Sequence, residues 1–274
     1  MKFKDQVAIV TGASSGIGKG ISLRLASEGA KVYLVARTLS KLESTRNEIL
    51  EKNGRAEIKS ADITDIDSIR KVINDVYQLE GRLDIVVNNA GGYKPITLDS
   101  SFDDVQDLID LDAIAPFKIT HYLIQKFSKE KENNLKILTI SSQAALKIFE
   151  AGIGYGTAKK ALTAALFELD SQLLSEGIGN IKLYKLYPGT VGTEGVIELV
   201  KQGILQNPTT LESVVDAAID LLADRTKTKD VYIGFVPGEG IKRTYLNSDP
   251  SQFKLLPEVS HEIIDAKFDP RSLI

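Results

Sequence analysis

Tyr155 and Lys159 are the two side chains in this sequence best suited to proton transfer. They are four residues apart in a segment that reads as a long helix, residues 155–174, so they share one helix face. An ammonium beside a phenol stabilises the phenolate, which makes the phenol a usable general acid or base for an alcohol–carbonyl couple. Ser142 ends the preceding apolar run and offers a hydroxyl that can hold a substrate oxygen. A tyrosine four residues before a lysine is common, so the pair needs support from other segments.

A glycine-rich loop near the N-terminus gives the second chemical signal. The loop reads Thr11-Gly12-Ala13-Ser14-Ser15-Gly16-Ile17-Gly18, directly after an apolar run and at the start of an amphipathic segment. Gly12 permits a tight turn, Gly16 lets the backbone approach a pyrophosphate, and Gly18 lets a helix pack closely on a sheet. Unpaired N–H groups at the helix start can donate to phosphates. A structural turn in another α/β protein is the alternative, because three glycines alone are a weak signal.

The end of the second apolar run bears on cofactor choice. An enzyme that uses NAD places an acid there for the ribose 2′-hydroxyl. This sequence has Ala36-Arg37-Thr38 instead, so a guanidinium is available for a 2′-phosphate. We therefore expect NADP(H) as the cofactor. A solvated surface arginine is the alternative.

The segments that must position these residues alternate short apolar runs with amphipathic helices. The predicted strands are residues 7–11, 32–35, 56–59, 83–87, 136–140, 181–187 and 231–235. The predicted helices are residues 17–26, 39–52, 66–79, 102–127, 155–174 and 211–222. This order predicts an α/β fold, a Rossmann-type doubly wound parallel sheet in a single domain. Most strands are continuous apolar runs, as expected when helices cover both faces of the sheet.

Composition removes several other classes of function. The 274 residues include no cysteine, which excludes disulfides and thiolate chemistry, and the only histidines, His121 and His261, are far apart in sequence. We therefore expect no metal site. The net charge of −3 gives no electrostatic reason to expect nucleic acid or a membrane surface as partner. No apolar stretch is long enough for a signal segment or a membrane span, so a cytoplasmic location is expected.

Taken in order, these marks resemble the short-chain dehydrogenase/reductase family over residues 3–234. The glycine loop has the family's spacing, and Asn88-Asn89-Ala90-Gly91 follows the fourth strand. Ser142 precedes Tyr155 by the family's usual interval, and Pro188-Gly189-Thr190-Val191-Gly192-Thr193 follows the sixth strand. Together these marks are highly specific.

The resemblance implies an oxidoreductase that moves a hydride between NADP(H) and a carbonyl or alcohol carbon. Ser142 would orient the substrate oxygen, Tyr155 would deliver or remove the proton, and Lys159 would hold the nicotinamide ribose. The cofactor contacts that it implies are Gly12, Ser14, Ser15, Gly16, Ile17, Gly18, Arg37, Asp62, Asn89, Ala90, Gly91, Tyr155, Lys159, Pro188, Gly189, Val191 and Thr193.

The sequence departs from the family at Asp112, where relatives usually have an asparagine. Pro116-Phe117 sets the alignment, and no asparagine occurs between residues 91 and 132. We count Asp112 with the catalytic group, and the favoured interpretation is a near-isostere that still offers its backbone carbonyl to a water relay. Its carboxylate could instead pair with Lys159 and weaken the effect of Lys159 on Tyr155, or it could relay a proton.

The C-terminus is a second departure. The glycine pair that ends the last strand in many relatives is missing, and a tail runs on to Ile274. We predict a dinucleotide-binding and catalytic domain over residues 1–240. The extension over residues 241–274 would cap the pocket or serve an interface, which puts the usual tetramer edge of the family in doubt.

The family's loops also suggest a substrate and an assembly. The candidate pocket residues are Tyr93, Gln143, Ala144, Gly192, Val196 and Ile197. Most are apolar or small, and Lys94 is the one basic side chain nearby, so a hydrophobic ketone, aldehyde or secondary alcohol is expected. A homodimer or homotetramer through the helices at 102–127 and 155–174 follows from the resemblance.

Two other functions stay open at this point. A redox-sensing protein that binds NADP with little turnover draws support only from Asp112 and the tail. An epimerase or dehydratase on the same fold is disfavoured by the compact length of the chain.

Overall fold

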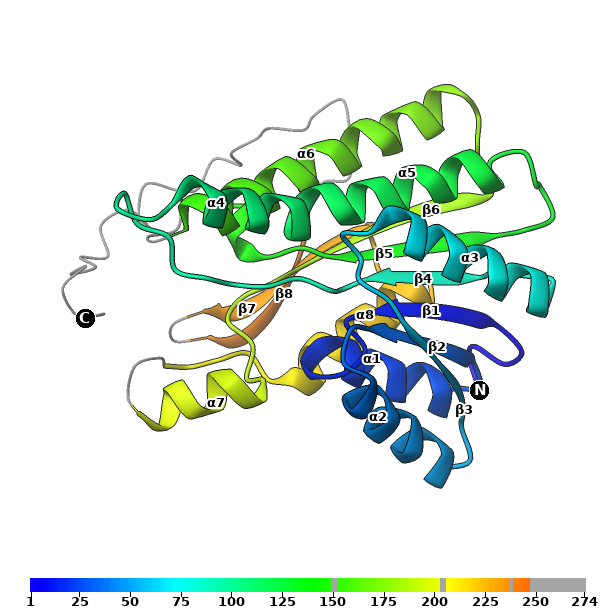
Figure 1. Cartoon of the computed structure of the whole chain (residues 1–274), viewed down its shortest axis with the longest axis horizontal. Coiled ribbons are helices and arrows are strands. Elements are labelled where there is room, and N and C mark those ends of the chain that lie inside the picture. Colours follow the sequence, from blue (N-terminus) through cyan, green and yellow to red (C-terminus); the bar gives the residue numbers. More distant parts are fainter. Residues whose placement is uncertain (149–151, 203–205, 237–238, 247–274) are drawn as a thin grey trace.

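The computed structural model describes residues 1–148, 152–202, 206–236 and 239–246 (Figure 1). The described residues form one eight-stranded sheet in the order β3-β2-β1-β4-β5-β6-β7-β8. The first seven strands are parallel, and only β8 pairs antiparallel, with β7. The strands are β1 (Val7–Thr11), β2 (Lys31–Ala36), β3 (Arg55–Ser60), β4 (Ile85–Asn88), β5 (Leu135–Ile140), β6 (Ile181–Pro188), β7 (Asp230–Val236) and β8 (Gly240–Tyr245).

Helices cover both faces of this sheet (Figure 1). One face carries α1 (Gly16–Ser27), α2 (Leu39–Glu51) and α8 (Leu211–Leu222), whose apolar side chains form one core cluster with the strands. The other face carries α3 (Ile66–Glu80), α5 (Ala115–Phe127) and α6 (Ile153–Ser175), which enclose a second cluster. The predicted doubly wound parallel sheet is confirmed, and its buried strands explain the continuous apolar runs.

The helix predicted over residues 102–127 is interrupted. α4 (Phe102–Ile109) passes into a π-helical turn, Asp110–Ile114, before α5 begins. Pro116 accounts for the interruption, because proline has no N–H to donate to the carbonyl four residues earlier, which belongs to Asp112. The prediction of one unbroken helix was therefore wrong at the turn that carries Asp112.

Two elements at the carboxyl end of the sheet were not predicted. α7 (Glu194–Lys201) follows the loop after β6, and β8 follows β7 as its antiparallel partner. The predicted boundary at residue 240 therefore falls at the start of a strand of the sheet. The function predicted for the extension falls mostly on residues 247–274, which lie outside the described residues.

Candidate functional site

The predicted site residues lie at the carboxyl ends of β1 to β6, at the start of α6 and on the turn that carries Asp112. β1 pairs with β2 on one side and with β4 on the other. The strands from β1 to β3 therefore extend the sheet in one direction and those from β4 onward extend it in the other, which makes the boundary between β1 and β4 a topological switch point. Loops on the two sides of such a switch point diverge and leave a crevice where open α/β sheets bind ligands. Figure 1 shows α4 and α7 at this same end of the sheet.

The glycine loop has the backbone that a pyrophosphate cradle needs. Gly12 and Gly16 have φ of +64° and +53°, a left-handed region that favours glycine. A Cβ on Gly12 would lie 2.7 Å from Asn89 Nδ2 and 2.9 Å from Ala90 Cα. Ser15, the N-cap of α1, makes no side-chain hydrogen bond to the helix, so its first N–H groups are not satisfied by the cap. The loop therefore fits a diphosphate approached by backbone N–H groups.

Thr11 joins this loop to the one after β4, a role that sequence reasoning missed. The Thr11 Oγ1 donates to the Val87 carbonyl and accepts from the backbone N–H groups of Asn89 and Ala90 at 3.0 and 3.1 Å. The Asn89 side chain returns a bond to the Thr11 carbonyl at 3.0 Å. A threonine as the last residue of the strand at the switch point was the available signal.

Arg37 and Asp62 lie beside each other at the ends of β2 and β3. The guanidinium is mostly exposed, at 74%, and its Nη1 lies 3.7 Å from Asp62 Oδ2. The backbone and side chain of Thr64 donate to Asp62 Oδ1, and these bonds, with the charge of Arg37, outweigh burial and hold the pKa of Asp62 below its ordinary value. The exposed guanidinium is free to turn toward a phosphate.

The loop after β6 closes the cradle from the other side. Thr193, the N-cap of α7, lies close to Gly16, with its Cγ2 3.3 Å from the position that a Cβ would take there. Val191 forms a parallel bridge with Thr209, which fixes the loop between β6 and α8. Residues of the loops after β1, β4 and β6 thus lie side by side at this end of the sheet.

Ser142, Tyr155 and Lys159 lie on two adjacent elements of the site. Ser142 caps a short 3-10 turn, Gln143–Ala145, and its Oγ accepts from the Ala144 N–H at 3.1 Å. Lys159 Nζ lies 5.5 Å from the ring centroid of Tyr155, as expected for i and i+4 positions of α6. Lys159 also donates to the carbonyl of Ile140, at the end of β5, at 3.4 Å.

Asp112 forms an ion pair with Lys159. Its Oδ1 lies 2.9 Å from Lys159 Nζ, and both side chains are buried. Burial alone would lower the pKa of Lys159, but the charges of Asp112 and Tyr155 outweigh it, so this pKa lies above its ordinary value. The pairing of the Asp112 carboxylate with Lys159, one of the alternatives that the sequence left open, is therefore present in the structure.

Lys160 supports the loop that follows Ser142, a second role that sequence reasoning missed. Its Nζ donates to the carbonyls of Ala144 and Lys147 at 2.6 and 2.9 Å, while burial lowers its pKa. Two basic residues in a row at positions 159 and 160 gave no sign that they would point to different partners.

The surroundings of Tyr155 are rich in apolar surface. Tyr93 packs edge-on against the Tyr155 ring, with centroids 5.6 Å apart. Lys94, the basic residue considered for an anionic substrate, is instead paired with Asp104. Exposed apolar side chains follow the carboxyl ends of β4, β5 and β6: Tyr93, Leu98, Phe102, Ile148, Ile153 and Ile197.

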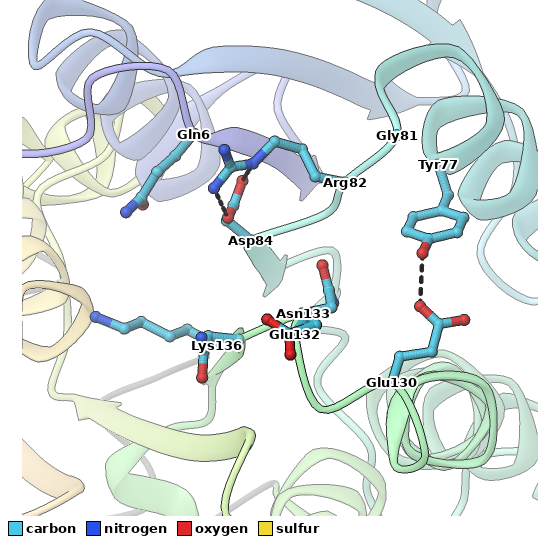
Figure 2. Close-up of a pocket in the computed structure, with 10 residues that line it drawn as sticks. Gln6, Tyr77, Gly81, Arg82, Asp84, Glu130, Glu132, Asn133 and Lys136 are labelled. Atoms are coloured by element: carbon cyan, nitrogen blue, oxygen red, sulfur yellow. Dashed lines mark hydrogen bonds and ion pairs between the residues drawn. The ribbon is translucent and has the colours of Figure 1, made fainter.

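A separate cavity of about 540 Å³ lies at the amino ends of the strands, opposite to the predicted site (Figure 2). Its walls come from residues before β1, β4 and β5, and Figure 2 shows Arg82 paired with Asp84 and Tyr77 with Glu130. Lys136, which also lines it, is paired with Asp224 at 2.7 Å. None of the predicted site residues lines this cavity.

Within the described part of the chain, no helix has the length and apolar character needed to cross a membrane.

Comparison with known proteins gives a consistent result. The family model described as short chain dehydrogenase matches residues 6–203. The chain is 32% identical over 234 residues to an uncharacterised oxidoreductase of Listeria monocytogenes, covering 80% of this chain and 92% of that protein. It is 30% identical over 223 residues to a fatty acyl-CoA reductase of Acinetobacter baylyi, covering 75% of each chain.

Solved structures agree. A 7α-hydroxysteroid dehydrogenase complexed with NADH and 7-oxo glycochenodeoxycholic acid superposes with a TM-score of 0.76 at 25% identity, over 87% of this chain and 95% of that chain. A metagenomic short-chain oxidoreductase in complex with NADP superposes with a TM-score of 0.70 at 25% identity, over 85% of this chain and 98% of that chain.

Proposed function

Because the chain belongs to the short-chain dehydrogenase/reductase family and is a nicotinamide-dependent oxidoreductase, we propose that it reduces carbonyl compounds with NADPH, with Tyr155 as proton donor. The observation that carries the proposal is the arrangement of Tyr155 and Lys159 on one face of α6, with Lys159 bonded to the carbonyl of Ile140 at the end of β5 and Ser142 following that strand. The cofactor would supply or accept the hydride, and the protein would move the proton.

The chain's own residues divide the remaining work. Ser142 Oγ would hold the substrate oxygen, and Tyr155 Oη would donate its proton to that oxygen as the carbonyl carbon receives the hydride. Lys159 would hold the nicotinamide ribose. Gly12, Ser14, Ser15, Gly16, Ile17 and Gly18 would hold the pyrophosphate, with Asp62 at the adenine, Asn89, Ala90 and Gly91 beside the cradle, and Pro188, Gly189, Val191 and Thr193 at the nicotinamide amide.

Arg37 supports NADPH rather than NADH. Its exposed guanidinium lies at the end of β2, where a 2′-phosphate would lie. The end of β2 also carries no acid, which would repel such a phosphate. The related structures include both an NADH and an NADP complex, so the preference rests on this residue.

The substrate that we propose is an apolar ketone or aldehyde. The Tyr93 ring beside Tyr155 and the exposed apolar side chains at this end of the sheet favour a hydrophobic molecule, while Lys94 is occupied by Asp104. A homodimer or homotetramer through the helical segments at residues 102–127 and 155–174, and a cytoplasmic location, stay predictions of the sequence.

Replacing Tyr155 with phenylalanine tests the proposal. NADPH oxidation across a panel of ketones and aldehydes should fall by roughly 10²–10⁴-fold in Tyr155→Phe, because the proton donor is lost. Fluorescence titration should find NADPH affinity nearly unchanged. Tyr122→Phe is the matched control and should keep wild-type turnover. Tyr122 lies on α5, and the change removes a hydroxyl that donates to Asn74 of α3.

Tight NADPH binding by the wild type with no turnover on any panel member, in either direction, would contradict the proposal. That outcome would favour a redox-sensing protein.

A further inference from the structure

Asp112 puts a carboxylate against the ammonium group of Lys159 in the interior of the protein. The two charged atoms are 2.9 Å apart, and neither side chain is more than 6% exposed. A buried pair of this kind is costly to desolvate, and it persists only where the geometry and further hydrogen bonds compensate.

The surroundings hold this carboxylate in place. Its Oδ2 accepts the backbone N–H of Gly92 at 3.1 Å. Its Oδ1 occupies the space that a Cβ on residue 91 would need, so the close approach depends on Gly91. Asp112 also sits on the π-helical turn ahead of Pro116, which aims it at α6. The carboxylate therefore joins the turn, the loop after β4 and Lys159.

Few other charged groups act on Lys159. Among the described residues, its electrostatic partners are Asp112 from the π-helical turn and Tyr155 from its own helix. Burial and the neighbouring Tyr155 raise the pKa of Tyr93, from the loop after β4, and Lys160 is directed to the carbonyls of Ala144 and Lys147. Asp112 is thus the one carboxylate that acts on the lysine within the described residues.

We propose that Asp112 is a positioning residue that fixes Lys159 and offsets its positive charge, so that Tyr155 stays a phenol and the site favours carbonyl reduction. A cation alone beside Tyr155 would stabilise the phenolate, whereas a cation paired with an anion has little net charge to do so. This inference rests on the proposed function.

The direction follows from the proton balance. In reduction, the carbonyl carbon takes the hydride and its oxygen takes the proton from Tyr155 Oη, so the phenol is the active form. In oxidation, Tyr155 must accept the alcohol proton and has to be a phenolate first. If Tyr155 stays a phenol up to a higher pH, reduction remains possible up to that pH, and oxidation begins only at a higher pH.

Neutral replacements of Asp112 test this role. In Asp112→Asn, the pH at which the reduction rate falls and the pH at which the oxidation rate rises should both be lower than in the wild type by roughly one unit. At a fixed pH in the sloping part of either profile, this corresponds to roughly a tenfold lower reduction rate or a tenfold higher oxidation rate. Asp112→Ala removes the side chain that lies against Gly91. It carries the same expectation and serves as the second test if the Asp112→Asn variant does not fold. Asp110→Asn, on the same turn and bonded to Gln106, is the matched control and should keep the wild-type profile.

A spectroscopic measurement makes the test independent of turnover. The ultraviolet difference spectrum between the wild type and Tyr155→Phe reports the tyrosinate of Tyr155, and it should contain no tyrosinate band at neutral pH. In the Asp112→Asn background, the band should appear at a lower pH than in the wild-type background. NADPH affinity is measured alongside to show that the cofactor site is intact.

Two results would overturn the inference: pH profiles of both neutral variants that coincide with wild type, or a Tyr155 tyrosinate band already present in the wild type at neutral pH. If the wild type turns over no substrate, the proposed function fails and the tyrosinate measurement decides the role of Asp112 alone.

Discussion

Arg37 and Tyr155 carry different parts of the proposed chemistry, and their environments differ accordingly. Tyr155 lies among packed groups, with Tyr93 against its ring and Lys159 one turn along α6. The Arg37 side chain is 74% exposed, and among the described residues its guanidinium has one loose ion-pair contact, with Asp62. Under the proposed NADP preference, the contribution of such an exposed side chain should appear in cofactor choice and not in stability.

Arg37→Ala should lower kcat/KM for NADPH by roughly tenfold to a hundredfold and leave that for NADH nearly unchanged, because a charge-assisted contact with the 2′-phosphate is worth roughly 1.5–3 kcal/mol. Steady-state kinetics with the two cofactors and one ketone measure this directly. Lys41→Ala, another exposed basic residue on nearby α2, serves as the control. Equal losses with both cofactors would remove Arg37 from the 2′-phosphate site.

At the scale of elements, the sheet is anchored by ion pairs at the amino ends of its strands, away from the site. Asp224 follows α8 and binds Lys136 of β5 and Lys182 of β6 at 2.7 and 3.1 Å, and Tyr184 donates to it. Burial alone would raise the pKa of Asp224, but the bonds from Lys136, Tyr184 and Lys182 lower it from 3.8 to about 2.

Asp224→Asn should therefore destabilise the fold at neutral pH. A depressed carboxyl pKa adds stability that is complete above pH 3.8 and is lost as the pH falls through about 2. Because Asp224 is partly exposed, the loss at pH 7 should be roughly 0.5–1 kcal/mol, and it should shrink as the pH falls below 4. Asparagine also tolerates the φ of +54° at this position, so the backbone stays unstrained.

Urea denaturation of wild type and variant across this pH range measures the difference. Asp216→Asn, which removes one exposed pair with Arg24 from α8, is the control and should have little effect at any pH. A stability loss in Asp224→Asn that is the same at pH 3 and pH 7 would contradict the assignment.

For the whole molecule, the candidate cofactor site is built from loops that belong to both halves of the sheet. The glycine loop follows β1, whereas the loops of Asn89, Ser142 and Thr193 follow β4, β5 and β6. A ligand that bridges these loops can bind only the folded chain, so cofactor binding and global unfolding are linked.

NADPH at about a hundred times its dissociation constant should stabilise the fold by about 2.7 kcal/mol. For a chain of this size that corresponds to a rise in melting temperature of roughly 5–10 °C. NADH at the same concentration should give a smaller rise, which differential scanning fluorimetry will resolve. Equal rises with NADPH and NADH would argue against the NADP preference, and ATP controls for general nucleotide effects.

The β7 edge also has a consequence for the whole molecule. β8 pairs with β7 along its length, so β7 does not offer a free edge to a second subunit. Among the described residues, β8 is therefore the outermost strand at this side of the sheet, and the doubt about the family's tetramer edge stays a prediction of the sequence.

The sequence by itself determined the features that depend on local rules. Strand and helix order followed from hydrophobic period, the left-handed turns at Gly12 and Gly16 from the freedom of glycine, and the shared face of Tyr155 and Lys159 from helix geometry. Each of these needs only residues close together in the chain. The predicted strands and helices were found near their predicted positions, except that the helix over residues 102–127 is interrupted and that α7 and β8 were not predicted.

Only the tertiary structure decided which distant residues meet. The carboxylate of Asp112 pairs with Lys159 because Gly91 leaves room for it, and Thr11 joins two loops because β1 and β4 are neighbours. The π-helical turn differs from these pairings, because its cause, Pro116, is local, although the apolar pattern of the helix gave no sign of it. Pairings of this kind depend on the close approach of separate segments, which local periodicity does not encode.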